Sequence, residues 1–331
     1  MIPELEDPER VRTLLDRPVQ VVAGKGGVGR TTLAVALALR ASRAGQRTLL
    51  LEVDAPDSAT RALGADPAPD TPREIENQLW VCRMTPPGAL KEYALLVLRF
   101  RLLYRIVFEN DLVKYLLRSI PSLAEVTMLG KAWWHATQDR RNDGRLRFER
   151  VIIDAPATGH AVTFLSVARV VADVAPAGVM KDQAEEMARM VEDAIMHVVA
   201  LPEEMPVTEG LELFGAVPER LRIGKGLAIL NRMTPGRLRP DDAAVLAALE
   251  ASGAAAPYVT AARRREARET LEIEHRDRFL AEARRPGLVV PEIPELGRSR
   301  LEGVIEALDS AAGTAVRNPD GTLRDGGEQA G

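Results

Sequence analysis

The run VVAGKGGVGRTT at residues 21–32 constrains this chain more than any other feature of its sequence. Gly24, Gly26 and Gly29 fit the pattern G-x-G-x-x-G, which is typical of a dinucleotide-binding turn. The same run fits G-x-x-x-x-G-[basic]-[S/T], the phosphate loop of nucleoside triphosphatases, with Arg30 where lysine is usual. The first question is therefore which nucleotide this loop binds.

Short apolar runs recur along the chain, and most of them precede a longer helical pattern. Near-continuous apolar strands that alternate with helices are typical of a parallel sheet covered on both faces. The sequence therefore predicts a doubly wound α/β fold with a mostly parallel sheet of about seven strands, whose ligands bind at the carboxyl ends of the strands. The expected strands are Val19–Ala23, Thr48–Val53, Leu79–Cys82, Val151–Ile153, His197–Leu201, Leu227–Leu230 and Leu288–Val290. The expected helices include Thr31–Arg43, Ala161–Val174, Val179–Ile195, Pro206–Leu221 and Pro257–Arg284.

The alternation of strands and helices is interrupted once, between about residues 88 and 145. This segment carries only helical patterns, which predicts a helical lobe inserted between two strands. We expect residues 1–17 to form a lead-in and residues 18–315 to form one phosphate-loop domain that includes the insertion. Residues 316–331 are polar and rich in glycine, and we expect them to be a disordered tail.

Composition and charge exclude several classes of function. A net charge of −4 and an aromatic content of 4% give no global basis for binding nucleic acid. The N-terminus lacks the apolar core of a signal peptide, and the apolar stretch Leu90–Phe108 is interrupted by arginines and cannot span a bilayer. Cys82 is the only cysteine, which suits a reducing compartment. We expect a cytoplasmic protein without an integral membrane segment, and a peripheral membrane partner stays open.

Three features of the opening run favour a triphosphate over a dinucleotide. Lys25 lies inside the turn, Arg30 begins the helix, and Thr31 and Thr32 follow at once. A triphosphate needs backbone N–H groups freed by glycine, a cation for the β- and γ-phosphates and a hydroxyl for Mg²⁺. A dinucleotide-binding turn needs neither the cations nor the hydroxyls.

A second motif, FERVIIDAPATGH at residues 148–160, supports the triphosphate. Asp154 ends a strand, and a carboxylate at the end of the strand beside a phosphate loop is where Mg²⁺-bound water is held. Gly159, in the following loop, supplies a backbone N–H that approaches a γ-phosphate without a Cβ in the way. The dinucleotide alternative keeps some support from Glu52 and Asp54, which lie where a ribose-binding carboxylate would be. Together the two motifs predict a phosphate-loop nucleoside triphosphatase.

These motifs resemble those of a known family. GKGGVGRTT resembles the deviant phosphate loop GKGGVGKTT, in which the extra lysine at the second position marks dimerising ATPases. DAPATGH followed by FL resembles the switch II signature DTAPTGHxxxFL of the arsenical pump-driving and tail-anchored-protein targeting ATPases. ALPEEMPVTEGLELF and LAILNRMTP resemble later segments of the same family. The resemblance covers most of residues 19–312, and it implies an ATPase that binds ATP and Mg²⁺ as a homodimer.

The resemblance implies a role for each residue that matches a family motif. Lys25 would reach across the dimer interface to the partner's nucleotide, and Thr32 would support the α-phosphate. Thr31 would ligate Mg²⁺, and Asp154 would hold the same ion through water. The nucleotide would lie on these residues of the loop, together with Gly159 and Asn231: Gly24, Lys25, Gly26, Gly27, Val28, Gly29, Arg30, Thr31 and Thr32.

Three of the residues near these motifs have a structural alternative. Asp54, on switch I, would orient or activate the attacking water, but it also fits a helix N-cap, since its surroundings depart from the usual D-P-A-[H/N]. Asn231 would hydrogen-bond the adenine, but it also fits a turn before Met233–Pro235. His160 fits either a sensor of nucleotide state or a cap of the switch II loop.

Arg30 replaces the lysine that lies along the β- and γ-phosphates in this family. A guanidinium keeps the charge and binds two oxygens at once, but it is planar, longer and differently hydrated. We expect nucleotide binding to persist and turnover to slow, because stabilising the transferred group depends on donor placement. The candidate catalytic residues are Lys25, Arg30 and Asp54. Three hypotheses follow: an ATP-hydrolysing dimeric switch, a nucleotide-binding regulator with little or no hydrolysis, and an NAD(P)-dependent oxidoreductase.

The partner of such a switch stays open. A single cysteine excludes a family-type arsenite site and a zinc-binding C-x-x-C pair. The apolar segment Leu90–Leu117 and the methionines of the helix Val179–Ile195 fit a groove for a hydrophobic protein client. Five residues of the helix Val179–Ile195, however, recur at helical spacing, which is typical of a stripe that faces the core: Met180, Ala184, Met187, Val191 and Ala194.

Two further patterns are weaker still. The run RRREARE at residues 263–269 is more typical of a solvated helix face than of a nucleic-acid patch, because acidic residues follow within a turn. His135, His197 and His275 lack the spacing of metal ligands and predict no metal site.

Overall fold

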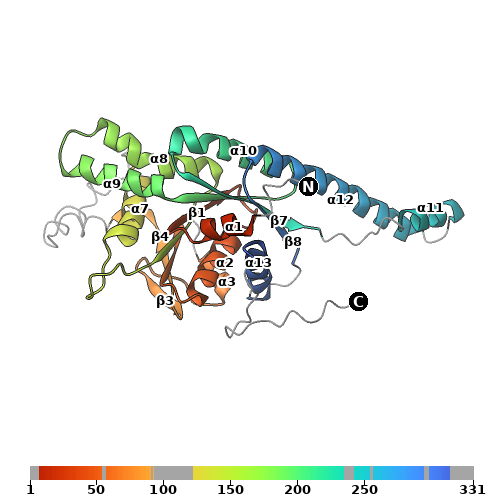
Figure 1. The fold of residues 1–331 in the computed structure, drawn as a ribbon, viewed down its shortest axis with the longest axis horizontal. Helices are drawn as coiled ribbons and strands as arrows, with labels where there is room; N and C mark the ends of the chain where they lie inside the picture. The colour runs from red at the N-terminus through yellow and green to blue at the C-terminus, as the bar shows by residue number, and fades with distance from the viewer. Residues whose placement is uncertain are drawn as a thin grey trace.

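The computed structural model describes residues 7–53, 57–90, 92, 122–234, 242–253, 256–293 and 298–313. Within them an eight-stranded sheet lies between two layers of helices (Figure 1). The strands are β1 (Val19–Gly24), β2 (Thr48–Val53), β3 (Arg73–Glu76), β4 (Leu79–Met84), β5 (Arg150–Asp154), β6 (Ile195–Ala200), β7 (Gly224–Met233) and β8 (Gly287–Pro291). Their order is β3-β4-β2-β5-β1-β6-β7-β8, and every neighbouring pair is parallel except β3–β4. This is the doubly wound α/β fold that the sequence predicts.

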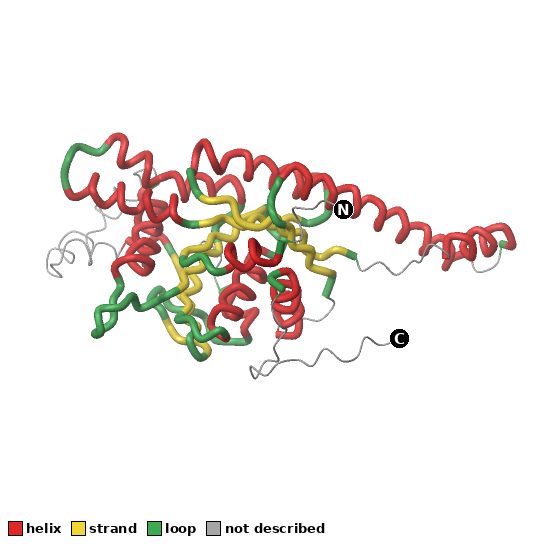
Figure 2. The backbone as a smooth tube through the Cα atoms, viewed as in Figure 1, coloured by secondary structure: helices red, strands yellow, loops and turns green. Residues whose placement is uncertain are grey.

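One face of the sheet, here called the α2 face, is covered by four helices (Figures 1 and 2). They are α1 (Pro8–Leu15), α2 (Arg30–Arg43), α3 (Ser58–Leu63) and α13 (Arg298–Ala311). The opposite face, the α8 face, is covered by the larger set. These are α7 (Leu123–Trp133), α8 (Thr158–Val174), α9 (Val179–Asp193), α10 (Glu204–Ala216) and α12 (Ala256–Ala283), with the π-helical turns η2 (Trp134–Gln138) and η3 (Val217–Leu221).

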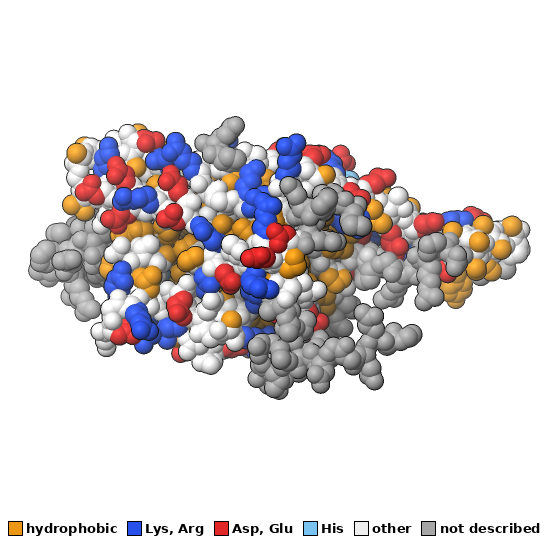
Figure 3. Space-filling view, in the orientation of Figure 1, with side chains coloured by type: hydrophobic (Ala, Val, Ile, Leu, Met, Phe, Trp, Pro, Cys, Tyr) orange, Lys and Arg blue, Asp and Glu red, His pale blue; other side chains and the backbone are white. Residues whose placement is uncertain are grey.

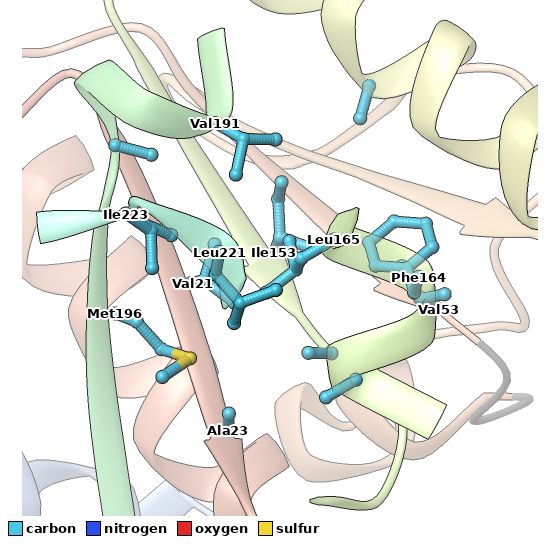
Figure 4. Close-up of a cluster of buried hydrophobic side chains, with 14 of the residues drawn as sticks. Val21, Ala23, Val53, Ile153, Phe164, Leu165, Val191, Met196, Leu221 and Ile223 are labelled. Carbon is cyan, nitrogen blue, oxygen red and sulfur yellow. The ribbon is translucent and has the colours of Figure 1, made fainter. Parts of the chain in front are cut away.

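Both faces of the central strands are buried, so successive residues enter two different cores. Leu50 and Ile152 belong to the core on the α2 face, whereas Leu51 and Ile153 belong to the core on the α8 face. Figure 4 shows part of the α8-face core, where side chains from β1, β5, β6, α8 and α9 meet. Because side chains alternate along a strand, double burial requires the near-continuous apolar runs seen in the sequence.

All seven expected strands are present, with ends that differ by at most three residues. The prediction of about seven strands was one short, because β3 was not expected. Its sequence, REIE, has no apolar run, since β3 is a half-exposed edge strand that pairs antiparallel with β4. The turn between β3 and β4 places Gln78 at φ 62°, a left-handed backbone conformation that the sequence pattern does not predict.

Two helices begin two or three residues earlier than expected. Helix α8 begins at Thr158 rather than Ala161, so Gly159 lies in the first turn of a helix and not in a loop. Helix α10 begins at Glu204, with Pro206 in its first turn, where a missing N–H costs no hydrogen bond. The helix expected over Val179–Ile195 ends at Asp193, because Ile195 already begins β6.

The inserted helical lobe is described only in part. Leu123–Trp133 forms α7, the turn η2 follows, and Arg140 and Leu146 form an isolated antiparallel bridge. The expected client segment Leu90–Leu117 and the tail 316–331 fall almost wholly or wholly outside the described residues. Among the described residues, no helix is both long enough and apolar enough to cross a bilayer.

The stripe of α9 is largely a core stripe. Ala184, Met187, Val191 and Ala194 are each no more than 3% exposed, which confirms their expected packing. The expectation was wrong for Met180, which is 65% exposed because it lies in the first turn of α9, beyond the edge of the core. The described part of α9 therefore offers one exposed methionine rather than a row of them.

Helix α12 extends from the body and carries α11 (Asp242–Ser252) at its far end (Figure 1). Its charged run is a solvated face, as expected: Arg265 pairs with Glu269, and acidic and basic side chains alternate along this part of the surface (Figure 3). Near its middle, buried Glu272 accepts hydrogen bonds from the backbone N and the Oγ1 of Thr234. Thr234 directly follows β7, so α12 is fastened to the end of that strand.

Candidate functional site

The phosphate loop connects β1 to α2 at the carboxyl edge of the sheet. Gly29 forms the N-cap of α2 at φ 97°, and a Cβ there would lie 2.2 Å from the Nδ2 atom of Asn231. Only glycine fits such a position. The first N–H groups of α2 have no partner inside the helix, and they carry the positive end of its dipole. The loop is therefore built to bind an anion such as phosphate.

Thr31 and Asp154 meet directly beside this loop. The Oγ1 atom of Thr31 donates a hydrogen bond of 2.5 Å to Oδ2 of Asp154, which ends the neighbouring strand β5. Asp154 is 1% exposed, and its other oxygen, Oδ1, has no hydrogen-bond partner. Burial raises the pKa of Asp154 to about 6, and the Thr31 hydrogen bond and the charge of Arg30 oppose that rise.

These two side chains fit a magnesium ion. Mg²⁺ prefers hard oxygen ligands and is usually held by one or two carboxylates together with waters and phosphate oxygens. The unpartnered oxygen of Asp154 and the hydroxyl of Thr31 supply oxygens of this kind at the mouth of the loop. Thr31 and Asp154, which the family resemblance assigns to magnesium, thus lie in direct contact, and their role as its ligands stays a prediction.

Arg30 is turned toward switch II. Its Nη1 atom donates a hydrogen bond to the carbonyl oxygen of Ala155, the residue after Asp154. Burial lowers the pKa of Arg30, and the charge of Asp154 opposes this shift. A guanidinium has five N–H donors, so this one bond does not exhaust its capacity for phosphate. In this structure Arg30 links the phosphate loop to the strand that carries Asp154.

Lys25 is held by a residue that sequence reasoning missed. Its ammonium group lies 2.7 Å from Oε1 of Glu209 on α10, and the Oγ1 atom of Thr158 donates to the other oxygen of Glu209 at 3.2 Å. The hydrogen bond from Lys25 is the main cause that lowers the pKa of Glu209. Glu209 lies in the family-like segment ALPEEMPVTEGLELF, but no local pattern indicates that it reaches the loop. Gly159 and the exposed His160 follow Thr158 in the first turn of α8.

Asn231 lies within β7 rather than in a turn, and it is 6% exposed. Its Nδ2 atom donates a hydrogen bond of 2.8 Å to the carbonyl oxygen of Val28, so it packs directly on the phosphate loop. A cavity of about 300 Å³ adjoins it, lined by Thr32 of α2, Arg232 of β7 and Arg300 of α13 among others. The size and the polar lining of this cavity suit the base and ribose of a nucleotide.

Glu52 is a second buried carboxylate near the loop. It is fully buried at the end of β2, and its Oε1 atom accepts a hydrogen bond of 2.6 Å from the N–H of Ala59 in α3. Burial raises the pKa of Glu52 to about 7, the charges of Asp154 and Asp57 add to the rise, and the Ala59 bond opposes it. The sequence suggested Glu52 only as a ribose ligand, because the neighbour of β2 in the sheet could not be read from it.

Asp54 lies outside the described residues, so its role on switch I stays a prediction. The N-cap of α3 is Asp57 rather than Asp54. The histidines are scattered: His197 is buried between Gln20 and the N–H of Leu227, and His135 contacts Asp139. Across the described ranges, no three His, Cys, Asp or Glu side chains are grouped to hold a metal ion.

The parallel sheet, the glycine loop at a helix N-terminus and the carboxylate of the next strand define a phosphate-loop nucleoside triphosphatase. Residues 18–222 match the sequence model of the anion-transporting ATPases. The chain belongs to this family of ATPases, which confirms the resemblance found in its motifs and favours the triphosphate over the dinucleotide.

Relatives in bacteria carry the same kind of name. The chain is 28% identical over 234 residues to a putative ATPase of Mycobacterium bovis and to the ATPase BagA of Mycobacterium tuberculosis. Each of these alignments covers 68% of this chain and 68% of the relative. A shorter match, 44% identical over 73 residues, links it to an uncharacterized protein of Streptomyces coelicolor and covers 22% of this chain and 17% of that protein.

Proposed function

We propose that this protein is a magnesium-dependent ATP hydrolase that works as a homodimeric switch and couples its nucleotide state to a protein partner. The observation that carries the proposal is the 2.5 Å contact between the Thr31 hydroxyl and the buried carboxylate of Asp154. A hydroxyl from the loop and a carboxylate from the next strand are the pair that a Mg²⁺–triphosphate requires.

Each residue of the site has a part in this function. The backbone N–H groups of the loop, which its glycines leave accessible, bind the β- and γ-phosphates, and Lys25 and Arg30 add positive charge. Thr31 and Asp154 would hold Mg²⁺, which would neutralise phosphate charge when bound. Asn231 and Thr32 border the cavity in which the adenosine would lie.

The proposal is tested by binding and by turnover in parallel. Calorimetry with ATP in the presence of Mg²⁺ and of EDTA measures the magnesium-dependent affinity, and a phosphate-release assay measures hydrolysis. We expect Asp154→Asn to abolish hydrolysis and most of the magnesium-dependent affinity. If the native protein shows no affinity for Mg²⁺–ATP, the proposed function is wrong.

The dimer is tested separately, by light scattering of the protein with Mg²⁺ and a non-hydrolysable ATP analogue. A doubling of the mass that depends on nucleotide supports the switch, and it should be lost in Lys25→Ala. A protein that stays monomeric at micromolar concentration with saturating nucleotide contradicts this part of the proposal.

A second candidate function is a nucleotide-binding regulator that hydrolyses ATP slowly or not at all. The hydrogen bond from Arg30 to Ala155 favours it, because a guanidinium engaged with switch II is less free to follow the transferred phosphate. Phosphate release from the native protein under saturating Mg²⁺–ATP separates the two functions.

A further inference from the structure

Glu52 and Asp154 lie at the same level near the carboxyl ends of two neighbouring strands: Glu52 is the residue before the last of β2, and Asp154 is the last of β5. Strands β2 and β5 are parallel neighbours, and Glu52 is paired with Asp154 in their register. Leu50 and Ile152, two residues earlier in each strand, both belong to the core on the α2 face. Because side chains repeat their direction every second residue, both carboxylates point to the α2 face, where Thr31 begins α2.

Each of the two carboxylates has one oxygen without a partner. Oε2 of Glu52 and Oδ1 of Asp154 are buried and accept no hydrogen bond, while their other oxygens bind Ala59 and Thr31. A buried oxygen of a carboxylate without a partner is costly, and two adjacent carboxylates repel each other as well. A cation between them removes both penalties at once.

We infer that Glu52 is a second carboxylate of the magnesium site, with its Oε2 atom facing the ion that Thr31 and Asp154 hold. The inference rests on the proposed function, and it adds a third protein oxygen to the two already described. Two carboxylates and one hydroxyl suit Mg²⁺. One carboxylate together with phosphates would hold the ion less tightly.

The same side chain joins the ion to α3. Oε1 of Glu52 accepts from the N–H of Ala59, in the first turn of the helix that follows the β2–α3 connection. One oxygen of Glu52 therefore fixes the start of α3 and the other faces the ion. Loss or gain of the ion would thus be transmitted to this helix through a single carboxylate.

The competing role for Glu52 is purely structural, as a cap for α3. A substitution separates the two roles, because Glu52→Gln keeps an oxygen that accepts from Ala59 but removes the charge. A cap survives this change, whereas a magnesium carboxylate does not. Glu302→Gln is the matched control: it removes a part-buried carboxylate that pairs with Arg43, the last residue of α2, about 20 Å from the loop.

The experiment is calorimetric titration of ADP into the native protein and both variants, once with Mg²⁺ and once with EDTA. We expect Glu52→Gln to lose roughly tenfold in affinity with Mg²⁺, the order found when groups around a metal are removed. With EDTA its affinity should be equal to or higher than that of the native protein, because a repelling charge near the phosphates is gone. Glu302→Gln should match the native protein in both buffers.

Several outcomes overturn the inference. Glu52→Gln with native affinity in both buffers shows that the charge does not contribute to the ion. Equal weakening in both buffers shows a structural role alone. If Glu52→Gln does not fold by circular dichroism, Glu52→Asp replaces it: that variant keeps the charge and should keep most of the magnesium-dependent gain, and loss of the gain overturns the inference. Absence of ADP binding to the native protein would instead count against the proposed function.

Discussion

Lys25 of the phosphate loop and Glu209 of α10 form an ion pair of 2.7 Å, although they are 184 positions apart in the sequence. Glu209 also accepts the hydroxyl of Thr158, at the start of α8. The carboxylate of Glu209 thus accepts hydrogen bonds from two donors, Lys25 and Thr158, beside the phosphate loop. In this arrangement Glu209 competes with phosphate oxygens for the ammonium group of Lys25.

Replacing Glu209 should therefore strengthen nucleotide binding. We expect Glu209→Gln to raise the affinity for Mg²⁺–ATP by about two- to fivefold, the scale of a part-exposed ion pair. Glu212→Gln, an exposed neighbour one turn away on the same helix, is the control and should behave as the native protein. Calorimetry decides, and weaker binding by Glu209→Gln would show that Glu209 positions Lys25 for the nucleotide rather than competing with it.

Arg30 should limit the rate of hydrolysis. Because its guanidinium donates to the carbonyl of Ala155, we expect Arg30→Lys to release switch II and to raise turnover by about tenfold, with little change in affinity. Steady-state phosphate release at saturating Mg²⁺–ATP measures the effect. A fall in turnover would mean that the arginine is the better residue for this loop.

Gly29 should be intolerant of a side chain for two separable reasons. Its φ of 97° strains any other residue, and a Cβ would meet the Asn231 amide at 2.2 Å. We expect Gly29→Ala to lower the free energy of unfolding by about 1–3 kcal/mol. In an Asn231→Ala background the cost should be smaller, because only the backbone strain remains, and urea unfolding of the four proteins measures this coupling. Equal costs in the two backgrounds would contradict the contact.

His197 should make the fold sensitive to acid. Burial, assisted by the charge of Arg285, lowers the pKa of His197 to about 3. Between pH 6.5 and 3 the unfolded chain binds a proton at this site and the folded chain does not, so stability falls as the pH falls. From pH 6.5 to 5 the loss is about 2 kcal/mol at most.

The measurement is urea unfolding of the native protein and of His197→Asn at pH 7 and pH 5. The carboxylates with raised pKa, Glu52 and Asp154, titrate in the opposite sense but contribute to both proteins, so they cancel in the difference. The native protein should lose more stability than the variant on acidification. Equal losses would show that His197 is not kept neutral by the fold.

Local patterns predicted most of the fold and named several residues that the structure brings together in the candidate site. The apolar runs of strands buried on both faces are visible in the sequence. Thr31 and Asp154, which the structure brings into contact, could both be named as candidate residues because each belongs to a recognisable motif. The edge strand β3 was missed, because half-exposed polar residues carry no periodic signal. The start of α8 was placed three residues late, because Pro156 and Gly159 suggested a loop.

The remaining contacts depend on the order of the strands, which a single sequence does not contain. Glu52 lies beside Asp154 only because β5 is the neighbour of β2, and Glu209 meets Lys25 only because α10 packs against β1. These two pairs join residues that are 102 and 184 positions apart in the sequence. They follow from topology and not from any local spacing.

The fastening of α12 to β7 has a geometric consequence. Glu272 accepts two hydrogen bonds from Thr234, which lies three residues after Asn231. From Glu272 back to Ala256, α12 extends over about 24 Å. A rotation of about 5° at Glu272 would sweep Ala256 through roughly 2 Å, by the same helix geometry. A small shift of β7 near Asn231, which borders the nucleotide cavity, would therefore be amplified into a larger displacement of α11 at the far end of α12.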